Sequence, residues 1–148
     1  MAARARFRAA GSPERRTATF RRLAIVWAGF LLLLTSWPSP PSVPVLSNIP
    51  SFDKFVHGVL YGVEALLLLR AIRWPGIPGV TLGRALAVVG ALAVFATADE
   101  THQFFIPGRS MDPMDAAMDT TGAALGSLVA GLAFPKTREG RRFPARSG

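Results

Sequence analysis

Residues 99–126 read DETHQFFIPGRSMDPMDAAMDTTGAALG, and this stretch decides how the fold of the chain is interpreted. It carries five acids, a His, a Gln and an Arg, although hydrophobic runs flank it on both sides. In its second half, the spacing i, i+4, i+7 and i+11 puts two carboxylates and two glycines on one helix face. Such a face on an otherwise apolar helix predicts a membrane protein with a polar site. The four residues are Asp115, Asp119, Gly122 and Gly126.

The composition supports this interpretation. The chain has 148 residues, the length of one domain, and 50% of them are hydrophobic. Its net charge is +8, but the basic residues lie mostly in the two tails, which fits membrane topology better than a nucleic-acid interface. The chain has no Cys, which excludes disulfides and thiolate metal sites.

The N-terminal segment is strongly basic. Residues 1–22 carry seven Arg against one Glu, among small and polar residues, and they predict a disordered arm. The first hydrophobic run, Leu23–Trp37, is slightly short for a span of about 20 residues, but Phe20 can extend it while Arg21 and Arg22 snorkel. A cleaved signal peptide is the competing interpretation. Prolines follow the run where a cleavage site would stand, and they favour an uncleaved helix.

Three further segments have the length and character of helices. A Pro/Ser-rich loop without charge, residues 38–52, separates the first helix from the second. A turn at residues 106–109 ends the third helix. The sequence therefore predicts an all-α fold, a four-helix transmembrane bundle over residues 21–135, between a basic cytoplasmic arm (residues 1–20) and a basic cytoplasmic tail (residues 136–148). The later three spans are predicted at Asp53–Ile72, Ala85–Ala98 and Asp115–Phe134.

Polar residues on the second predicted helix also share one face. They are spaced i, i+4, i+8 and i+11, with a Lys beside the first of them. The last, Glu64, lies about 16 Å along the helix from the first, near the middle of a bilayer, so its carboxyl is expected to face the bundle. The face consists of Asp53, His57, Tyr61 and Glu64, with Lys54 beside Asp53.

The distribution of Lys and Arg predicts the orientation. The N-terminal arm, the region around the loop 73–84 and the C-terminal tail carry seven, three and five of these residues, and the loop after the first helix carries none. The positive-inside rule therefore places both termini and the loop 73–84 in the cytoplasm. The two polar faces are then expected to meet at the outer leaflet.

The polar residues of the middle of the chain suit several kinds of chemistry. Both His residues, the only Tyr and seven of the nine acids lie between Asp53 and Asp119. Carboxylates with imidazole can hold a divalent cation, a His beside carboxylates can act as a general acid or base, and Arg109 can clamp an anionic headgroup. The candidate catalytic residues are His57, His102, Asp99, Glu100 and Arg109. The candidate substrate-binding residues are Lys54, Tyr61, Gln103 and Arg109. The candidate cation ligands are Asp53, Asp115 and Asp119.

Structural roles are the alternative for many of these residues. Asp53 and Asp115 can cap their helices, and His57 and Tyr61 can join helices by hydrogen bonds. A G-x-x-x-G pattern on the acidic face permits close helix packing. Asp119 lies one turn inside Asp115 on the same face, so it needs a partner in the membrane. The sequence contains no HExxH and no Walker-type motif.

Three motifs follow one another in this chain: Asp53-Lys54-x-x-His57-x-x-x-Tyr61, Asp99-Glu100-x-His102-Gln103-x-Phe105-x-Pro107-Gly108-Arg109 and Asp115-x-x-x-Asp119-x-x-Gly122-x-x-x-Gly126. Together they resemble the VanZ-like family of small bacterial membrane proteins, over residues 20–135. The family is named for a member linked to resistance to the glycopeptide teicoplanin. Its pattern usually has Asn where this chain has Asp119, which adds negative charge and removes two donors. Glu64 lies outside the family motif.

The resemblance implies a multi-pass protein of the bacterial inner membrane, with glycopeptide resistance as the trait behind the family name. The leading hypothesis is a protein that binds or modifies an anionic lipid-linked cell-surface component, with His57 or His102 as general base and Arg109 on the headgroup. The second is a non-catalytic structural or partner-binding module whose polar residues form an interhelical network. A third is an ion or proton pathway through Glu64 and Asp119, which requires an oligomer.

Overall fold

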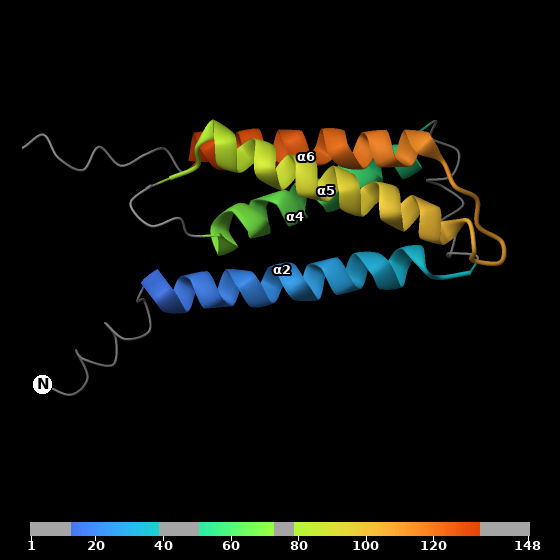
Figure 1. Ribbon diagram of the computed structural model, residues 1–148, viewed down its shortest axis with the longest axis horizontal. Coiled ribbons are helices and arrows are strands. Elements are labelled where there is room, and N and C mark those ends of the chain that lie inside the picture. Colours follow the sequence, from blue (N-terminus) through green and yellow to red (C-terminus); the bar gives the residue numbers. More distant parts are fainter. Residues whose placement is uncertain (1–12, 39–50, 73–78, 134–148) are drawn as a thin grey trace, which may run out of the picture.

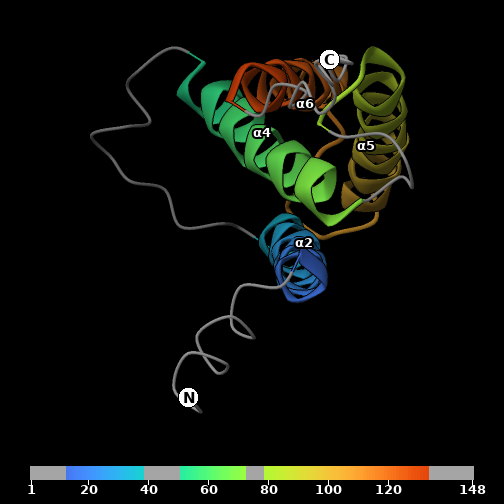
Figure 2. The ribbon, with the colours of Figure 1, turned by 90° about the vertical axis from the view of Figure 1, so that its left-hand side faces the viewer.

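The computed structural model describes residues 13–38, 51–72 and 79–133, and within these ranges it contains four α-helices and no strand. Successive helices run in opposite directions along the bundle (Figure 1). Viewed along the bundle, α6 packs beside α4, α5 closes the third side, and α2 lies against α4 (Figure 2). The all-α prediction is therefore confirmed. The helices are α2 (Pro13–Thr35), α4 (Phe52–Ala71), α5 (Leu82–Gln103) and α6 (Pro113–Ala133).

The first helix is longer than the sequence predicts. Residues 13–22, predicted as part of a disordered arm, form the first turns of α2. Pro13 suits the first helical position, and the Glu, Arg and Ala residues that follow are good helix formers, so an apolar helix already nucleated at Leu23 extends backwards. The predicted arm up to residue 12, the loop at 39–50, the loop at 73–78 and the tail from residue 134 lie outside the described residues.

The start of α6 and the C-terminus of α4 are capped by side chains for which the sequence predicted other roles. Asp115 was a predicted cap of the last helix, but α6 begins at Pro113, and Asp112 Oδ1 accepts the amide of Met114 at 2.9 Å. Arg84, one of the three basic residues in the region around the loop 73–84 that were used to predict the orientation, is buried. Its guanidinium donates to the carbonyls of Leu69, Ile72 and Gly79, and so it caps the C-terminus of α4.

Several polar side chains are buried together with the apolar core, and many large apolar side chains are exposed. Of the four largest side chains that are almost fully buried, two are Gln103 and Asp119. Large apolar side chains are instead exposed on the outer faces of the helices, for example Ile25, Val94 and Leu132 at 69%, 72% and 73%. This arrangement is expected where the surrounding solvent is lipid.

Two of the four described helices are long and apolar enough to cross a membrane: Glu14–Thr35, which overlaps the predicted first span, and Leu82–Gln103, which contains the predicted third span. The predicted four-span bundle is therefore supported in part. The other two helices are not among these candidate spans: α4 carries four charged residues, and α6 combines two Asp with many small residues. These two helices are also the ones that pack most closely together.

The close packing of α4 on α6 depends on glycines of both helices. A Cβ built on Gly122 would lie 1.9 Å from the carbonyl oxygen of Gly58, and one on Gly126 would lie 2.2 Å from that of Gly62. Both helices therefore carry a G-x-x-x-G pattern, and the two backbones touch directly. The pattern on α6 was predicted from the sequence, but the matching pattern of Gly58 and Gly62 on α4 was not.

Replacing Gly122 with Ala is expected to force α4 and α6 apart and to lower stability. Because the added methyl group meets backbone, the cost is expected at or above about 1–3 kcal/mol, the usual range for overpacking. Gly131→Ala is the matched control in the same helix, since its Cβ meets nothing within 4 Å, and Ala there should be neutral or stabilising. Thermal unfolding of the two variants in detergent tests this, and equal midpoints would contradict the close crossing.

Candidate functional site

An ion cluster joins the beginning of α4 to the beginning of α6. Lys54 Nζ lies 2.6 Å from Asp112 Oδ2, 2.8 Å from Asp115 Oδ1 and 3.6 Å from Asp53 Oδ2. The Lys54 ammonium, together with the Met114 amide, lowers the pKa of the Asp112 carboxyl. Three carboxylates therefore surround one ammonium, and the charge of Lys54 is more than neutralised.

A His–Asp pair lies one turn deeper on the same two helices. His57 Nδ1 is 3.1 Å from Asp119 Oδ1, and its Nε2 is 4.0 Å from Asp115 Oδ2. Asp119 is 0% exposed, and among the described residues its Oδ2 has no hydrogen-bond partner. The partner that the sequence analysis required for Asp119 is therefore His57, which can reach it because Gly58 and Gly122 bring the two backbones into contact.

A hydrogen-bonded chain runs from α5 into the turn before α6. Gln103 Nε2 donates to Glu100 Oε1 at 2.8 Å, and the Asp112 amide donates to Glu100 Oε2 at 2.9 Å. Arg109 donates through Nε to Gln103 Oε1 at 3.1 Å and through a second nitrogen to the same oxygen. Glu100 and Gln103 are both buried, at 2% and 1% exposed. This chain fixes the turn that carries Arg109 and Asp112.

Asp99 belongs to a different contact, between α5 and α2. Its Oδ1 lies 2.8 Å from the Thr35 hydroxyl, and both residues are buried. Thr35 was not singled out from the sequence, although a hydroxyl at the end of the run LLLLT is the signal that could have identified it. Tyr61 is buried too, against Phe95, and among the described residues its hydroxyl has no hydrogen-bond partner.

The structure brings most of the predicted site residues to one end of the bundle, but not into one group. The predicted cation ligands are divided, because Asp53 and Asp115 pair with Lys54 while Asp119 pairs with His57. His102 is exposed on α5, on a different face from the buried Glu100 and Gln103. Asp53 is also exposed. The buried group is made by His57 from α4, Glu100 from α5 and Asp119 from α6, whose ligand atoms lie within 4.8 Å of one another.

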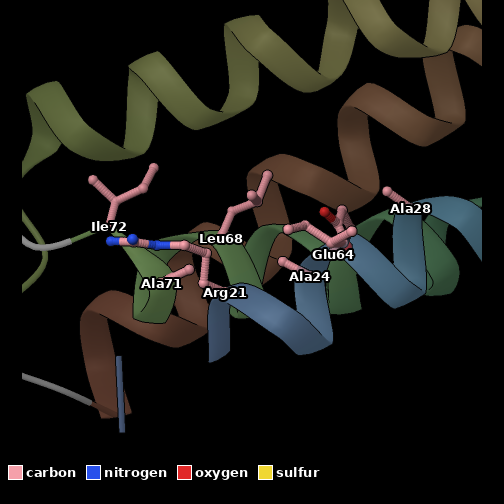
Figure 3. Close-up of a pocket in the computed structure, with 8 residues that line it drawn as sticks. Arg21, Ala24, Ala28, Glu64, Leu68, Ala71 and Ile72 are labelled. Carbon is pink, nitrogen blue, oxygen red and sulfur yellow. The ribbon is translucent and has the colours of Figure 1, made fainter. Parts of the chain in front are cut away.

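A second polar feature lies away from this end, in a groove of about 440 Å³ between α2 and α4. Its walls are mostly apolar, and Figure 3 shows the guanidinium of Arg21 beside Ile72 and the carboxyl of Glu64 nearer Ala28. Glu64 is 3% exposed, and among the described residues its Oε2 has no hydrogen-bond partner. As predicted from its place on the polar face, Glu64 is directed inward, although no charge in the described chain pairs with it.

Replacing Glu64 with Leu is expected to raise the stability of the bundle. The change removes a buried oxygen without a partner and adds apolar contact with α2, for a gain of about 1–2 kcal/mol. The measurement is the thermal midpoint in detergent, with Glu14→Leu at the exposed start of α2 as the control that should change little. A lower midpoint for Glu64→Leu would mean that the carboxyl makes a stabilising interaction.

Comparison with known proteins agrees with the geometry. No curated protein and no solved structure matches the chain. The model of the VanZ/LLP1 family matches residues 13–134, which include all four helices, the ion cluster and the buried His57 and Asp119. The family match, together with two helices long and apolar enough to cross a membrane, indicates a membrane protein. The chain belongs to the VanZ/LLP1 family.

Proposed function

We propose that the protein binds or modifies an anionic, lipid-linked component of the bacterial cell surface. In this proposal it spans the cytoplasmic membrane several times, with both termini in the cytoplasm and the polar end of the bundle at the outer leaflet. The single observation that carries the proposal is the convergence of the half-buried His57, the buried Asp119, a cation and several carboxylates at one end of the bundle. Buried polar groups are costly in a membrane protein, and such groups mark functional sites.

Arg109 is the better of the two candidate cations for an anionic headgroup. The ammonium of Lys54 is already neutralised by Asp112 and Asp115. Arg109 is in no ion pair within the described chain, and its guanidinium bonds to the neutral amide of Gln103. It therefore keeps its full positive charge at the edge of the site, and a planar guanidinium suits a phosphate or carboxylate.

His57 is the candidate base. With its Nδ1 proton donated to Asp119, the neutral imidazole keeps a lone pair on Nε2, and the buried carboxylate orients the ring. The exposed His102 has no such partner among the described residues, so it is the weaker of the two candidate bases. In an enzymatic form of the proposal, His57 would accept a proton from a nucleophile while Arg109 holds the headgroup.

Binding of a polyprenyl phosphate tests the headgroup preference, with the polyprenol of equal length as the uncharged control. The wild-type protein in detergent is expected to bind the phosphate more tightly than the alcohol. Arg109→Gln should weaken phosphate binding by about 10- to 100-fold, because a charge-assisted hydrogen bond is worth about 1.5–3 kcal/mol. Arg16→Gln, at the exposed N-terminal part of α2, should change nothing. Equal affinity for the two lipids, or an unaffected Arg109→Gln protein, would overturn the proposal.

The proposed orientation can be tested directly because the chain contains no Cys. A single Cys in place of the exposed Ser110, in the turn before α6, is expected to react with a membrane-impermeant maleimide on intact spheroplasts. A Cys in place of Arg16 should react only after the membrane is opened. Labelling of the Arg16→Cys protein from outside, with Ser110→Cys protected, would show the reverse orientation.

A non-catalytic module is the second candidate, and a specific observation favours it. Both oxygens of Glu100 accept structural hydrogen bonds, from Gln103 and from the Asp112 amide, and Lys54 ties two helix beginnings together. If the protein is such a module, substitutions at the site should lower the amount of folded protein in the membrane and its function together. Arg109→Gln with a normal protein level and lost lipid binding separates the two candidates.

A further inference from the structure

The buried group at the centre of the site has the composition of a metal centre. Three helices each contribute one ligand, and the ligand atoms lie within 4.8 Å of one another before any ion is present. A cation with bonds of about 2.0–2.2 Å to imidazole and carboxylate holds its neighbouring ligand atoms about 3–3.5 Å apart. The 3.1 Å between His57 Nδ1 and Asp119 Oδ1 falls in that range.

Independent evidence comes from atoms that lack a partner. Asp119 is completely buried, and within the described residues its Oδ2 accepts no hydrogen bond. The hydroxyl of Tyr61, one turn from His57 on α4, is also buried without a partner and interacts electrostatically with Asp119 and Glu100. Buried oxygens in such positions are normally satisfied by protein, water or an ion. A cation would bind Asp119 Oδ2 and would also neutralise two adjacent carboxylates.

From these observations we infer that His57, Glu100 and Asp119 form a binding site for a divalent transition-metal cation. One imidazole with two carboxylates suits a borderline ion such as Zn²⁺ or Mn²⁺ better than Ca²⁺ or Mg²⁺, which prefer oxygen ligands alone. The hydrogen bonds from Gln103 and the Asp112 amide then act as outer contacts that orient the Glu100 carboxylate. Each carboxylate oxygen keeps a further lone pair for the ion.

The inference rests on the proposed function, because it concerns the same site, but it changes the role of His57. With an ion bound, the Nδ1 lone pair would bind the metal in place of the hydrogen bond to Asp119, so His57 would be a metal ligand and not the base. The test uses the metal alone. The full chain, with any affinity tag removed, is stripped with a chelator, incubated with Zn²⁺ or Mn²⁺ and desalted, and the metal that remains is measured by mass spectrometry. Wild type is expected to retain about one ion per chain. At an ion concentration of about 100 times Kd, the thermal midpoint should rise by about 5 °C or more.

Matched variants identify the ligands. Asp119→Asn and Glu100→Gln keep the shape of the side chains and are expected to lose the metal and the thermal shift, with affinity at least about 100-fold weaker. His57→Ala should do the same, whereas His102→Ala, which removes the other His of the chain, should bind like wild type. Asp53→Asn, an exposed acid paired with Lys54, should also bind like wild type.

Three results would overturn the inference. One is the absence of retained metal in wild type, and another is equal retention by wild type and Asp119→Asn. The third is an Asp119→Asn protein that is more stable than metal-free wild type while neither binds metal, since this would identify an uncharged hydrogen-bonded network. Metal binding without any preference for the polyprenyl phosphate would leave the inference standing and would remove the proposed function alone.

Discussion

The direct contact between the backbones of α4 and α6 is the constraint on which the site depends. Gly58 and Gly62 face Gly122 and Gly126, and no side chain separates the two helices. Because the axes approach so closely, the residues beside the glycines are forced together, and His57 meets Asp119 as a result. Wider spacing would leave both groups buried but unpaired, which is unfavourable in a membrane. The glycine packing motif therefore determines the geometry of the polar site.

Neighbouring contacts follow from the same geometry. Most of the acids of the described chain lie away from the outer faces, which the exposed apolar side chains of α2, α5 and α6 occupy. They are gathered inside and at one end, where Lys54 neutralises part of the negative charge, and where the Asp112 backbone amide and the Gln103 side-chain amide satisfy Glu100. Glu64 is the exception, because it is buried and, within the described residues, its Oε2 has no hydrogen-bond partner.

Helical periodicity predicted correctly that Asp119, Gly122 and Gly126 share a buried face of α6. The predicted polar face of α4 is divided, because Asp53 is exposed and Glu64 lies in the groove with α2. Periodicity could not predict how the helices are rotated and shifted against one another. The division of the predicted cation ligands between Lys54 and His57 depends on that shift, as does the contact of Thr35 with Asp99. Arg84 illustrates a further limit, because a charge count cannot distinguish an arginine at the membrane surface from one that caps a helix.

The turn between α5 and α6 connects the two parts of the site. The side chain of Asp112 binds Lys54, and the backbone amide of the same residue binds Glu100. Arg109 lies in this turn and is held by Gln103, which also binds Glu100. An anion that draws Arg109 away from Gln103 would therefore disturb the hydrogen bonds of Glu100, next to His57 and Asp119. If the protein binds a headgroup as proposed, such binding at Arg109 would be coupled to the buried carboxylates through this one segment, because each contact shares a residue with the next.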